Sequence, residues 1–468
     1  MNSSMKNCFW FVAGLFLTID GLYSQELLHF EPVLSLNHVV EEGISYTLFG
    51  AVAPNDPNRL YLVRKTGEVS VLDVRTGEAL PVPFLIVDDV STRPQGGLYS
   101  MVFHPEYQSN GRLFVCYVAV NGDFVVEEYV RQSANRATKG KRVLVIQRPN
   151  DDAFHLDNGG WMGFGNDGYL HISVGRGLAT NRQTNLASSL LRIDVNGDDF
   201  PNTKDRNYSI PSINPLADIS GYEEVIANGF KNPWRCSFDS VGNLYIGALG
   251  GVLREEIDLI PVGYPYALNF GFPCFEGTFQ HSDPLECLDR PAGIQFALPI
   301  FDYGHTDTLS GIIGGYVIET PIERLQGHYV YADLRDPYHL YSIVFDGTKD
   351  PRQFNGANVT KAATWRTSVP LLLQGVDQFV VSFFDDEENN LYLITTVGLI
   401  YKLDSIRRVG DFNGDGMVSL LDIDGFVQSL SGDVFGGLAD GYQGLADINY
   451  DLVVDTNDIL PFIELILD

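Results

Sequence analysis

Residues 154–172 read FHLDNGGWMGFGNDGYLHI, and this stretch decides the fold. The paired glycines Gly159 and Gly160 predict one tight turn, and Asn166-Asp167-Gly168 predicts a second. Alternating apolar residues lie on both sides of the second turn, a pattern typical of β-strands. We therefore expect a β-hairpin with a loop above it, forming part of a larger sheet.

A phrase from this hairpin recurs along the chain: a turn residue, a variable residue, then two or three apolar or aromatic residues. Its copies begin at Asn58, Gly111, Gly168, Gly242, Gly327 and Asn389. No helical period separates the copies, as expected if each is one strand of a four-stranded blade. The repetition predicts an all-β fold, a six-bladed β-propeller over residues 25–408. A β-sandwich, the alternative, would not repeat one phrase over so long a chain.

The pattern changes after Arg408, where an acidic loop occurs twice. Oxygen-bearing side chains occupy loop positions 1, 3, 5, 9 and 12, the spacing by which one turn wraps Ca²⁺, and position 7 would ligate through its main-chain carbonyl. The first loop uses Asp411, Asn413, Asp415, Met417, Ser419 and Asp422, and the second uses Asp447, Asn449, Asp451, Val453, Asp455 and Asp458. An apolar helix face follows each loop. We expect residues 409–468 to form a small helical calcium-binding domain, with a weaker second site because Leu452 replaces the usual glycine.

Residues 1–24 predict a signal peptide, because one lysine precedes an apolar run too short to cross a bilayer. We expect a secreted, periplasmic or cell-surface protein without a membrane span. The chain has 31 Lys and Arg against 60 Asp and Glu, a net charge of −29. This charge argues against nucleic acid or anionic lipid as a partner, and it leaves calcium and neutral sugars compatible.

Export also bears on the cysteines. Cys274 and Cys287 lie in one loop, and an oxidising compartment makes a disulfide between them the expected state. Cys116 and Cys236 lie in strand-like segments, where we expect buried, unpaired thiols.

Seven stretches in order resemble the soluble glucose and sorbosone dehydrogenases that use pyrroloquinoline quinone. Among them are QGGLYSMVFHPEYQSNGRLFV and IANGFKNPWRCSFD, and the resemblance covers about Val39 to Leu403. It implies a secreted enzyme that oxidises the anomeric hydroxyl of a sugar or polyol by hydride transfer to the quinone, with calcium as a second cofactor. Residues 409–468 resemble a type I dockerin, which implies calcium-dependent folding and docking to a cohesin-like partner.

Such chemistry needs a base near the sugar hydroxyl and a cation near the quinone oxygens. By the resemblance, Gln95 and Asn232 match cofactor-binding positions of the family. Lys231 stands where the family has arginine, which keeps the charge but not the planar fork. Asp157 stands where the family has its catalytic histidine. His155 is the alternative base, because residues two apart in an extended segment point the same way.

Other positions also depart from the family pattern. Arg176 and Ala248 stand where family members often have acids. The sequence Asp157-Asn158-Gly159 also favours a turn, and such a turn would be expected at a blade connection that has no function. Among the histidines, His104 is expected in the scaffold, and His305 lies in a loop that could line the pocket.

Three functions therefore stay open. The first is the quinone-dependent sugar dehydrogenase, with Asp157 or His155 as the base. The second is an inactive propeller that binds carbohydrate or protein, like the hedgehog-interacting proteins of the same superfamily. The third is a calcium-dependent lactonase, which would need acids and asparagines converging from several blades, and no such set can be assembled from the sequence.

Overall fold

The structure is a computed structural model. It describes residues 26–34, 46–147, 157–178, 186–280, 293–306, 311–319, 322–336, 339–347, 349–367, 372–373, 376–377, 379–431, 443–449 and 454–467. The predicted signal peptide, residues 1–24, lies outside these ranges. Within them, no helix is both long enough and apolar enough to span a membrane.

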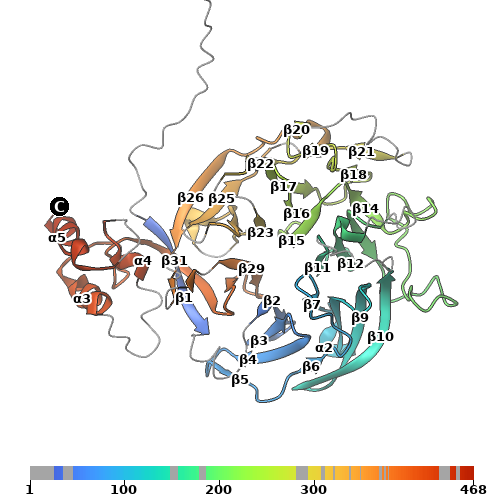
Figure 1. Ribbon diagram of the computed structural model, residues 1–468, viewed down its shortest axis with the longest axis horizontal. Coiled ribbons are helices and arrows are strands. Elements are labelled where there is room, and N and C mark those ends of the chain that lie inside the picture. The colour runs from blue at the N-terminus through green and yellow to red at the C-terminus, as the bar shows by residue number, and fades with distance from the viewer. Residues whose placement is uncertain are drawn as a thin grey trace, which may run out of the picture.

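Inner strands surround one axis, and each contacts its two neighbours in a closed ring (Figure 1). They are β2 (Thr47–Ala53), β7 (Gly97–Phe103), β11 (Gly159–Phe164), β15 (Asn232–Phe238), β23 (Ile312–Val317) and β29 (Val380–Asp385). A ring of this kind, with a sheet extending outward from each member, is the architecture of a β-propeller. The described strands therefore form a propeller of six blades.

Further strands complete each blade by antiparallel pairing outward from the inner strand. The first blade adds β3 (Asp56–Arg64), β4 (Glu68–Asp73), β5 (Glu78–Ala79) and β6 (Leu85–Ile86), and the second adds β8 (Arg112–Val118), β9 (Phe124–Ser133) and β10 (Arg136–Ile146). The third adds β12 (Leu170–Val174), β13 (Ser189–Ile193) and β14 (Val225–Asn228), then β18 (Ala267–Asn269) and β21 (Ile294–Phe296) in parallel.

The later blades follow the same plan. The fourth adds β16 (Leu244–Leu249), β17 (Arg254–Ile260) and β22 (Phe301–Gly304), and the fifth adds β24 (Tyr329–Asp333), β25 (His339–Val344) and β26 (Lys361–Thr367). The sixth adds β30 (Leu391–Thr395), β31 (Ile400–Arg408) and β1 (Glu26–Leu34). Small elements outside the blades are β19 (Phe275–Glu276), β20 (Phe279–Gln280), β27 (Leu372–Leu373), β28 (Val376–Asp377) and α2 (Tyr107–Asn110).

The phrase that recurs in the sequence marks the second strand of every blade. Its copies fall on β3, β8, β12, β16, β24 and β30. Those strands are buried on both faces between neighbouring blades, so they keep apolar residues at successive positions; β12, for example, is buried throughout. The prediction of a blade repeat is confirmed, and each copy of the phrase lies on an inner strand of its sheet, next to the strand at the axis.

The N-terminal strand β1 closes the ring. It pairs antiparallel with β31, and its first residues also pair in parallel with β26 of the fifth blade. The last blade is therefore built from both ends of the propeller segment, which ties the ring shut by hydrogen bonds between distant parts of the chain.

A small helical unit follows β31 at the side of the propeller (Figure 1). It contains α3 (Ile423–Ser431), α4 (Gln443–Ala446) and α5 (Ile459–Leu467). Phe426 of α3 and Phe462 of α5 stack with ring centroids 4.0 Å apart, and Phe412 packs against both. The expected helices are present, but they are short, and the assignment of this unit as a dockerin stays a prediction.

Candidate functional site

The predicted site residues lie where inner strands β11 and β15 begin, at one end of the propeller axis, which we call the upper face. Asp157 and Asn158 precede β11, Lys231 precedes β15, and Arg176 follows β12. The backbone N–H of Arg176 donates to the carbonyl of Lys231, 2.8 Å away, so the two loops are joined. His155, the alternative base, lies outside the described residues.

The backbone of Asp157 is held in a left-handed conformation with φ of 64°. Its carbonyl oxygen accepts a hydrogen bond of 2.8 Å from the N–H of Gly177. A Cβ at Gly175 would lie only 2.1 Å from that carbonyl, so glycine is required there for the close approach. Aspartate is one of the few side chains that tolerate such a φ, which agrees with turn chemistry at this position.

Two cations face the Asp157 carboxylate. Its Oδ1 lies 3.5 Å from Nζ of Lys231, and its Oδ2 lies 3.8 Å from Nε of Arg176. The side chains of Asp157 and Lys231 are 15% and 20% exposed, whereas that of Arg176 is 51% exposed. Lys231 also donates to the carbonyl of Gly250 at 2.7 Å. We call Asp157, Lys231 and Arg176 the charged trio.

Gln95 and Asn232, the predicted cofactor residues, lie next to the trio. Their hydrogen bonds there join neighbouring loops to one another. Asn232 Oδ1 accepts from the N–H of Gly159 at 2.8 Å. The main-chain carbonyl of Gln95 accepts from Asn158 Nδ2 at 2.8 Å, and Tyr99 also donates to it. These contacts fix the loop that carries Asp157.

Two neighbouring side chains of β15 bond to other inner strands below the trio. Trp234 Nε1 donates to the carbonyl of Val381 on β29, 3.3 Å away. Arg235 is fully buried; its Nη2 donates across the axis to the carbonyl of Leu48 on β2 at 2.7 Å. The guanidinium carbon lies 4.2 Å from the Trp234 ring centroid, and burial lowers the pKa of Arg235 to about 10. Sequence reasoning missed Arg235, although an arginine after a tryptophan at the same inner strand was visible.

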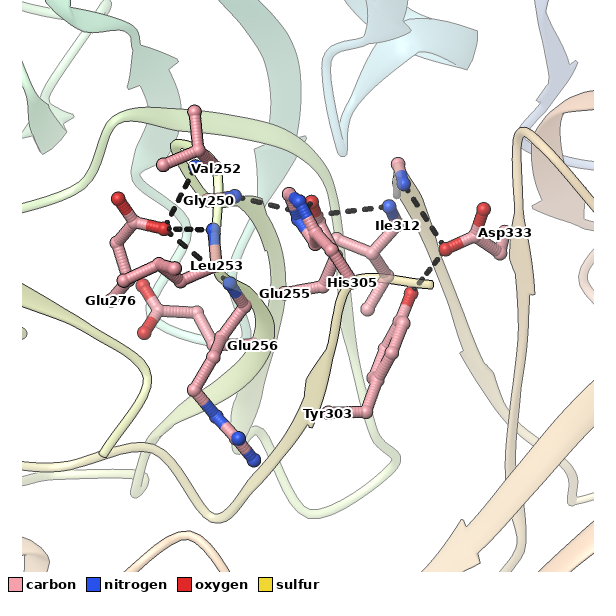
Figure 2. A network of polar contacts seen from close by, with 12 residues as sticks. Gly250, Val252, Leu253, Glu255, Glu256, Glu276, Tyr303, His305, Ile312 and Asp333 are labelled. Atoms are coloured by element: carbon pink, nitrogen blue, oxygen red, sulfur yellow. Dashed lines mark hydrogen bonds and ion pairs between the residues drawn. The ribbon is translucent and has the colours of Figure 1, made fainter. Parts of the chain in front are cut away.

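A second polar network adjoins the trio through Gly250 (Figure 2). Glu255 on β17 is buried, and its Oε2 accepts from the N–H groups of Gly250 and Ile312, each at 3.2 Å. Its Oε1 lies 2.6 Å from Nε2 of His305. Burial raises the pKa of Glu255, and the bonds from Ile312 and His305 act in the opposite direction. His305 thus lies beside the upper face, held by a carboxylate.

The loop between β16 and β17 is itself held by a carboxylate. Glu276 Oε2 accepts from the N–H groups of Val252 at 2.9 Å and Leu253 at 2.7 Å (Figure 2). On the other side, Asp333 accepts from the Tyr303 hydroxyl at 2.7 Å. These bonds make the surroundings of His305 rigid. Neither Glu255 nor Glu276 was singled out from the sequence, because their partners are distant in the chain.

Several single-residue expectations can be compared directly. His104 is buried and its Nδ1 accepts from the N–H of Glu106 at 3.0 Å, which confirms a scaffold role. Cys116 and Cys236 are buried and free, as expected. Cys274 is disulfide-bonded, but Cys287 lies outside the described residues, so that pairing stays a prediction. Ala248 is buried inside β16.

A cavity of about 290 Å³ opens at the other end of the axis. Its lining is mostly apolar, and the aromatic members include Phe49, Phe103, Phe164, Phe238 and Tyr316. Asp385 is the one carboxylate among these lining residues, and its side chain reaches solvent. Asp157, Gln95, Lys231 and Asn232, the predicted site residues that the structure describes in the propeller, do not line this cavity.

The first predicted calcium loop is organised by its own acids. Asp411 accepts from the N–H groups of Gly414 at 2.8 Å and Gly416 at 2.9 Å.

The buried Asp422 accepts from Phe412, Asn413 and Ser419 N–H groups at 2.8 to 2.9 Å. Ser419 caps the short helix reciprocally with Asp422. Asp415 Oδ1 accepts from the N–H of Met417 at 2.9 Å.

The second loop repeats part of this plan. Asp458 accepts from the N–H groups of Ile448 at 2.7 Å and Asn449 at 3.0 Å, and it forms a capping box with Asp455. Asp451 and Val453 lie outside the described residues. In the part of the chain that the structure describes, no three His, Cys, Asp or Glu side chains are arranged to hold a metal ion. Calcium ligation by either loop is therefore not shown by the side-chain positions.

A family model described as glucose/sorbosone dehydrogenase matches residues 49–391, from the first blade to the sixth. The chain belongs to this family. Solved structures of similar fold support the propeller. The soluble aldose sugar dehydrogenase from Escherichia coli aligns with a TM-score of 0.59 at 18% identity, covering 81% of this chain and 99% of that one. The PQQ-bound aldose sugar dehydrogenase from Streptomyces coelicolor aligns with a TM-score of 0.55 at 18% identity, covering 80% and 96%.

Proteins related to this chain in sequence have names that do not mention a dehydrogenase. HIPL1 protein of Arabidopsis thaliana is 27% identical over 435 residues, which cover 74% of this chain and 60% of that protein. Hedgehog-interacting protein of Mus musculus is 28% identical over 320 residues, covering 63% of this chain and 42% of that protein. The chain thus spans less than two thirds of the length of these relatives, and membership of the family does not by itself establish catalysis.

Proposed function

We propose that the chain is a sugar-binding propeller that has lost quinone-dependent oxidation. The placement of Asp157 between Lys231 and Arg176 carries this proposal. A general base must offer a free oxygen or nitrogen to the proton that it removes. Each oxygen of Asp157 faces a cation instead, so the residue at the family's base position acts as the centre of a charge cluster.

The described residues of the upper face do not fit pyrroloquinoline quinone. This cofactor is a tricarboxylate and needs unopposed positive charge, yet Lys231 and Arg176 both face the Asp157 carboxylate. Asp157 would place a further anion beside it, at a cost in a partly buried setting. Redox chemistry, with the cofactor and its calcium, is therefore the competing hypothesis that the experiment must exclude, and we derive no step from it.

A neutral sugar fits the charged trio better. Sugar hydroxyls both donate and accept hydrogen bonds, and the trio offers an acceptor in Asp157 beside donors in Lys231 and Arg176. Such a ligand brings no charge, which also agrees with the net charge of −29. Structures of the same fold named as glucose and aldose sugar dehydrogenases further support a sugar as the ligand class.

Binding to a panel of neutral mono- and disaccharides, measured by calorimetry and glycan array, tests the proposal. We expect a sugar to bind the mature chain, and Asp157→Asn and Lys231→Met to weaken its binding at least about tenfold, or about 1.4 kcal/mol. Arg352→Gln is the matched control, because this exposed arginine pairs with Asp350 and not with a member of the trio. A panel without any binder would contradict the proposal.

A dye-reduction assay separates binding from oxidation. The unmodified chain, given the quinone, calcium and an aldose, is expected to reduce no dye. Sugar-dependent reduction at micromolar quinone would overturn the loss of redox function. The triple variant Asp157→His, Lys231→Arg, Arg176→Asp restores the family pattern at three of the four departures and leaves Ala248 unchanged. Quinone binding by it would show that these three positions account for the difference.

We also propose that the C-terminal unit binds calcium through its first loop. Its potential ligands are all oxygens, as a hard cation requires, and the acids already orient the loop backbone. A cohesin-like partner, secretion and removal of residues 1–24 stay predictions from the sequence. Mass spectrometry of the chain recovered from its host's medium would test export and cleavage together.

A further inference from the structure

The cavity at the end of the axis opposite the upper face, which we call the lower cavity, is built by the whole ring. Each of the inner strands β2, β7, β11, β15, β23 and β29 contributes lining residues toward its C-terminal end. The volume of about 290 Å³ is close to that of the smallest ligand pockets in proteins, which span about 300 to 1,000 Å³. The lower cavity therefore has room for a small organic molecule.

Aromatic rings and thioethers make up much of this lining. Five phenylalanines, Trp161 and Tyr316 contribute rings, and Met101 and Met162 contribute sulfur atoms. Such side chains pack well against an apolar ligand. The face of an aromatic ring also attracts a positive charge that lies against it. The lining thus suits an apolar group and tolerates a cation beside it.

The charges around the lower cavity all have one sign. A second cavity, of about 230 Å³, adjoins it by sharing Phe238, Tyr316 and Asp385, and its lining adds Asp239 and Glu319. Among the described residues that line the two cavities there is no lysine, arginine or histidine. A region lined by charge of one sign favours a ligand of the opposite sign. The ligand expected here is therefore a cation.

Asp385 is the carboxylate best placed to meet that cation. It is exposed and lines both cavities, and within the described part of the chain its carboxylate forms no ion pair and no hydrogen bond with another residue. Its neighbours are already engaged: Glu319 accepts from the N–H of Ser240 at 2.9 Å. Asp239 accepts from the N–H and the side-chain amide of Asn243, each at 2.7 Å.

The buried Arg235 sets the direction in which a cationic ligand would lie. On β15 it comes two residues before Ser237, a lining residue, so it lies on the side of the upper face. Its guanidinium carbon is 5.0 Å from the ring centroid of Phe49, which lines the lower cavity. Like charges repel strongly where little water screens them. The positive end of a ligand is therefore expected beside Asp385, the last residue of β29, with its apolar part among the rings.

We propose that the lower cavity is a second binding site, which takes a small organic cation with an aromatic or apolar group next to a substituted ammonium. Asp385 pairs with the ammonium, and the rings hold the rest of the molecule. A metal ion fits less well, because it would find one available carboxylate where calcium needs six to eight oxygen ligands. The site is separate from the charged trio, so the inference does not rest on sugar binding at the upper face.

The methionines allow the site to be tested directly. Met101 and Met162 line the lower cavity, whereas Met417 is exposed in the C-terminal unit. The full-length chain, with isotope-labelled methionine methyl groups, is titrated with benzyltrimethylammonium and followed by NMR. We expect the Met101 and Met162 signals to shift saturably while Met417 stays unchanged. Phenylacetate, which has the same ring and a negative charge, should shift none of them.

Two results of this titration would overturn the proposal. One is that Met101 and Met162 do not respond to benzyltrimethylammonium at millimolar concentration. The other is that phenylacetate moves their signals as benzyltrimethylammonium does, because binding would then depend on the ring alone.

Variants test the role of the charge. Asp385→Asn keeps the shape and should weaken the binding of benzyltrimethylammonium at least about tenfold, with the melting temperature unchanged. Asp346→Asn is the matched control, because Asp346 is exposed and lines neither cavity. Phe238→Leu removes a ring shared by the two cavities and should weaken binding about threefold. Equal affinity of Asp385→Asn and Asp346→Asn would overturn the proposal.

Asp157→Asn separates this site from the upper face. It should leave the binding of benzyltrimethylammonium unchanged, even where it weakens the binding of a sugar. Loss of benzyltrimethylammonium binding in Asp157→Asn would place the cation at the charged trio and overturn the second site. Failure of every sugar to bind, with the response of Met101 and Met162 intact, would refute the sugar proposal and leave the second site standing.

Discussion

The propeller and the C-terminal unit use their acidic side chains over different distances along the chain. In the unit, Asp422 binds backbone N–H groups no more than ten residues away. In the propeller, Glu255 meets Ile312 and His305, which are 57 and 50 residues away. Local contacts make a loop that can be recognised from spacing alone. Distant contacts make a site that exists only once the blades are arranged.

Replacing Asp422 by alanine should have the largest effect. The change leaves three N–H groups without their acceptor, of which that of Phe412 is buried, and we expect a loss of roughly 3 to 5 kcal/mol from the C-terminal unit. That exceeds what a core of this size can supply, so the unit should unfold while the propeller persists. Differential scanning calorimetry should show one transition lost and the main one unchanged.

Asp424→Asn provides the control for this prediction, since Asp424 lies two residues later and is exposed. It should leave both transitions in place. If Asp422→Ala lowered the main transition as strongly as the minor one, the two regions would be a single cooperative unit and the contrast between them would be wrong.

Glu255→Ala should have the next largest effect, and on the propeller. It removes the acceptor of Gly250 and Ile312 and the partner of His305. The buried N–H of Ile312 and the partly buried N–H of Gly250 then lack an acceptor, which should cost about 2 to 4 kcal/mol. Urea denaturation followed by tryptophan fluorescence would measure it. Glu106→Ala, at an exposed residue, should change little; an equal loss in the two variants would contradict a specific role for Glu255.

The same contrast explains what the sequence could predict. The blade repeat could be recognised because the second strand of each blade is largely buried and therefore apolar. The duplicated loop could be recognised because Asp411 and Asp422 bond to N–H groups of their own loop. The departures at Asp157 and Arg176 were visible too. Their contact was not, because it depends on the turn after β12 returning to the start of β11. Glu255 and Arg235 were missed for the same reason.

Asp258→Asn tests a buried acid of the propeller through pH. Asp258 is fully buried, neither oxygen has a hydrogen-bond partner among the described residues, and burial raises its pKa well above 3.8. The folded state then holds a proton that the unfolded state releases, so stability falls as pH rises above 3.8. Asparagine does not ionise and should gain about 1 to 2 kcal/mol near neutral pH. Melting curves from about pH 4 to pH 8 should diverge; parallel curves would refute the ionisation.

Asp157→Asn should have the smallest effect on stability. Asparagine keeps the shape and tolerates the same left-handed φ, so the loop need not change. The lost ion pairs are weak, because Arg176 is half exposed and Lys231 also binds Gly250. We expect less than about 1 kcal/mol by urea denaturation, together with the loss of sugar binding proposed above. A large loss of stability would show that the charged trio stabilises the fold. Lost sugar binding at unchanged stability would show that the trio binds a ligand. The outcome thus decides whether distant contacts at the upper face serve the fold or a function.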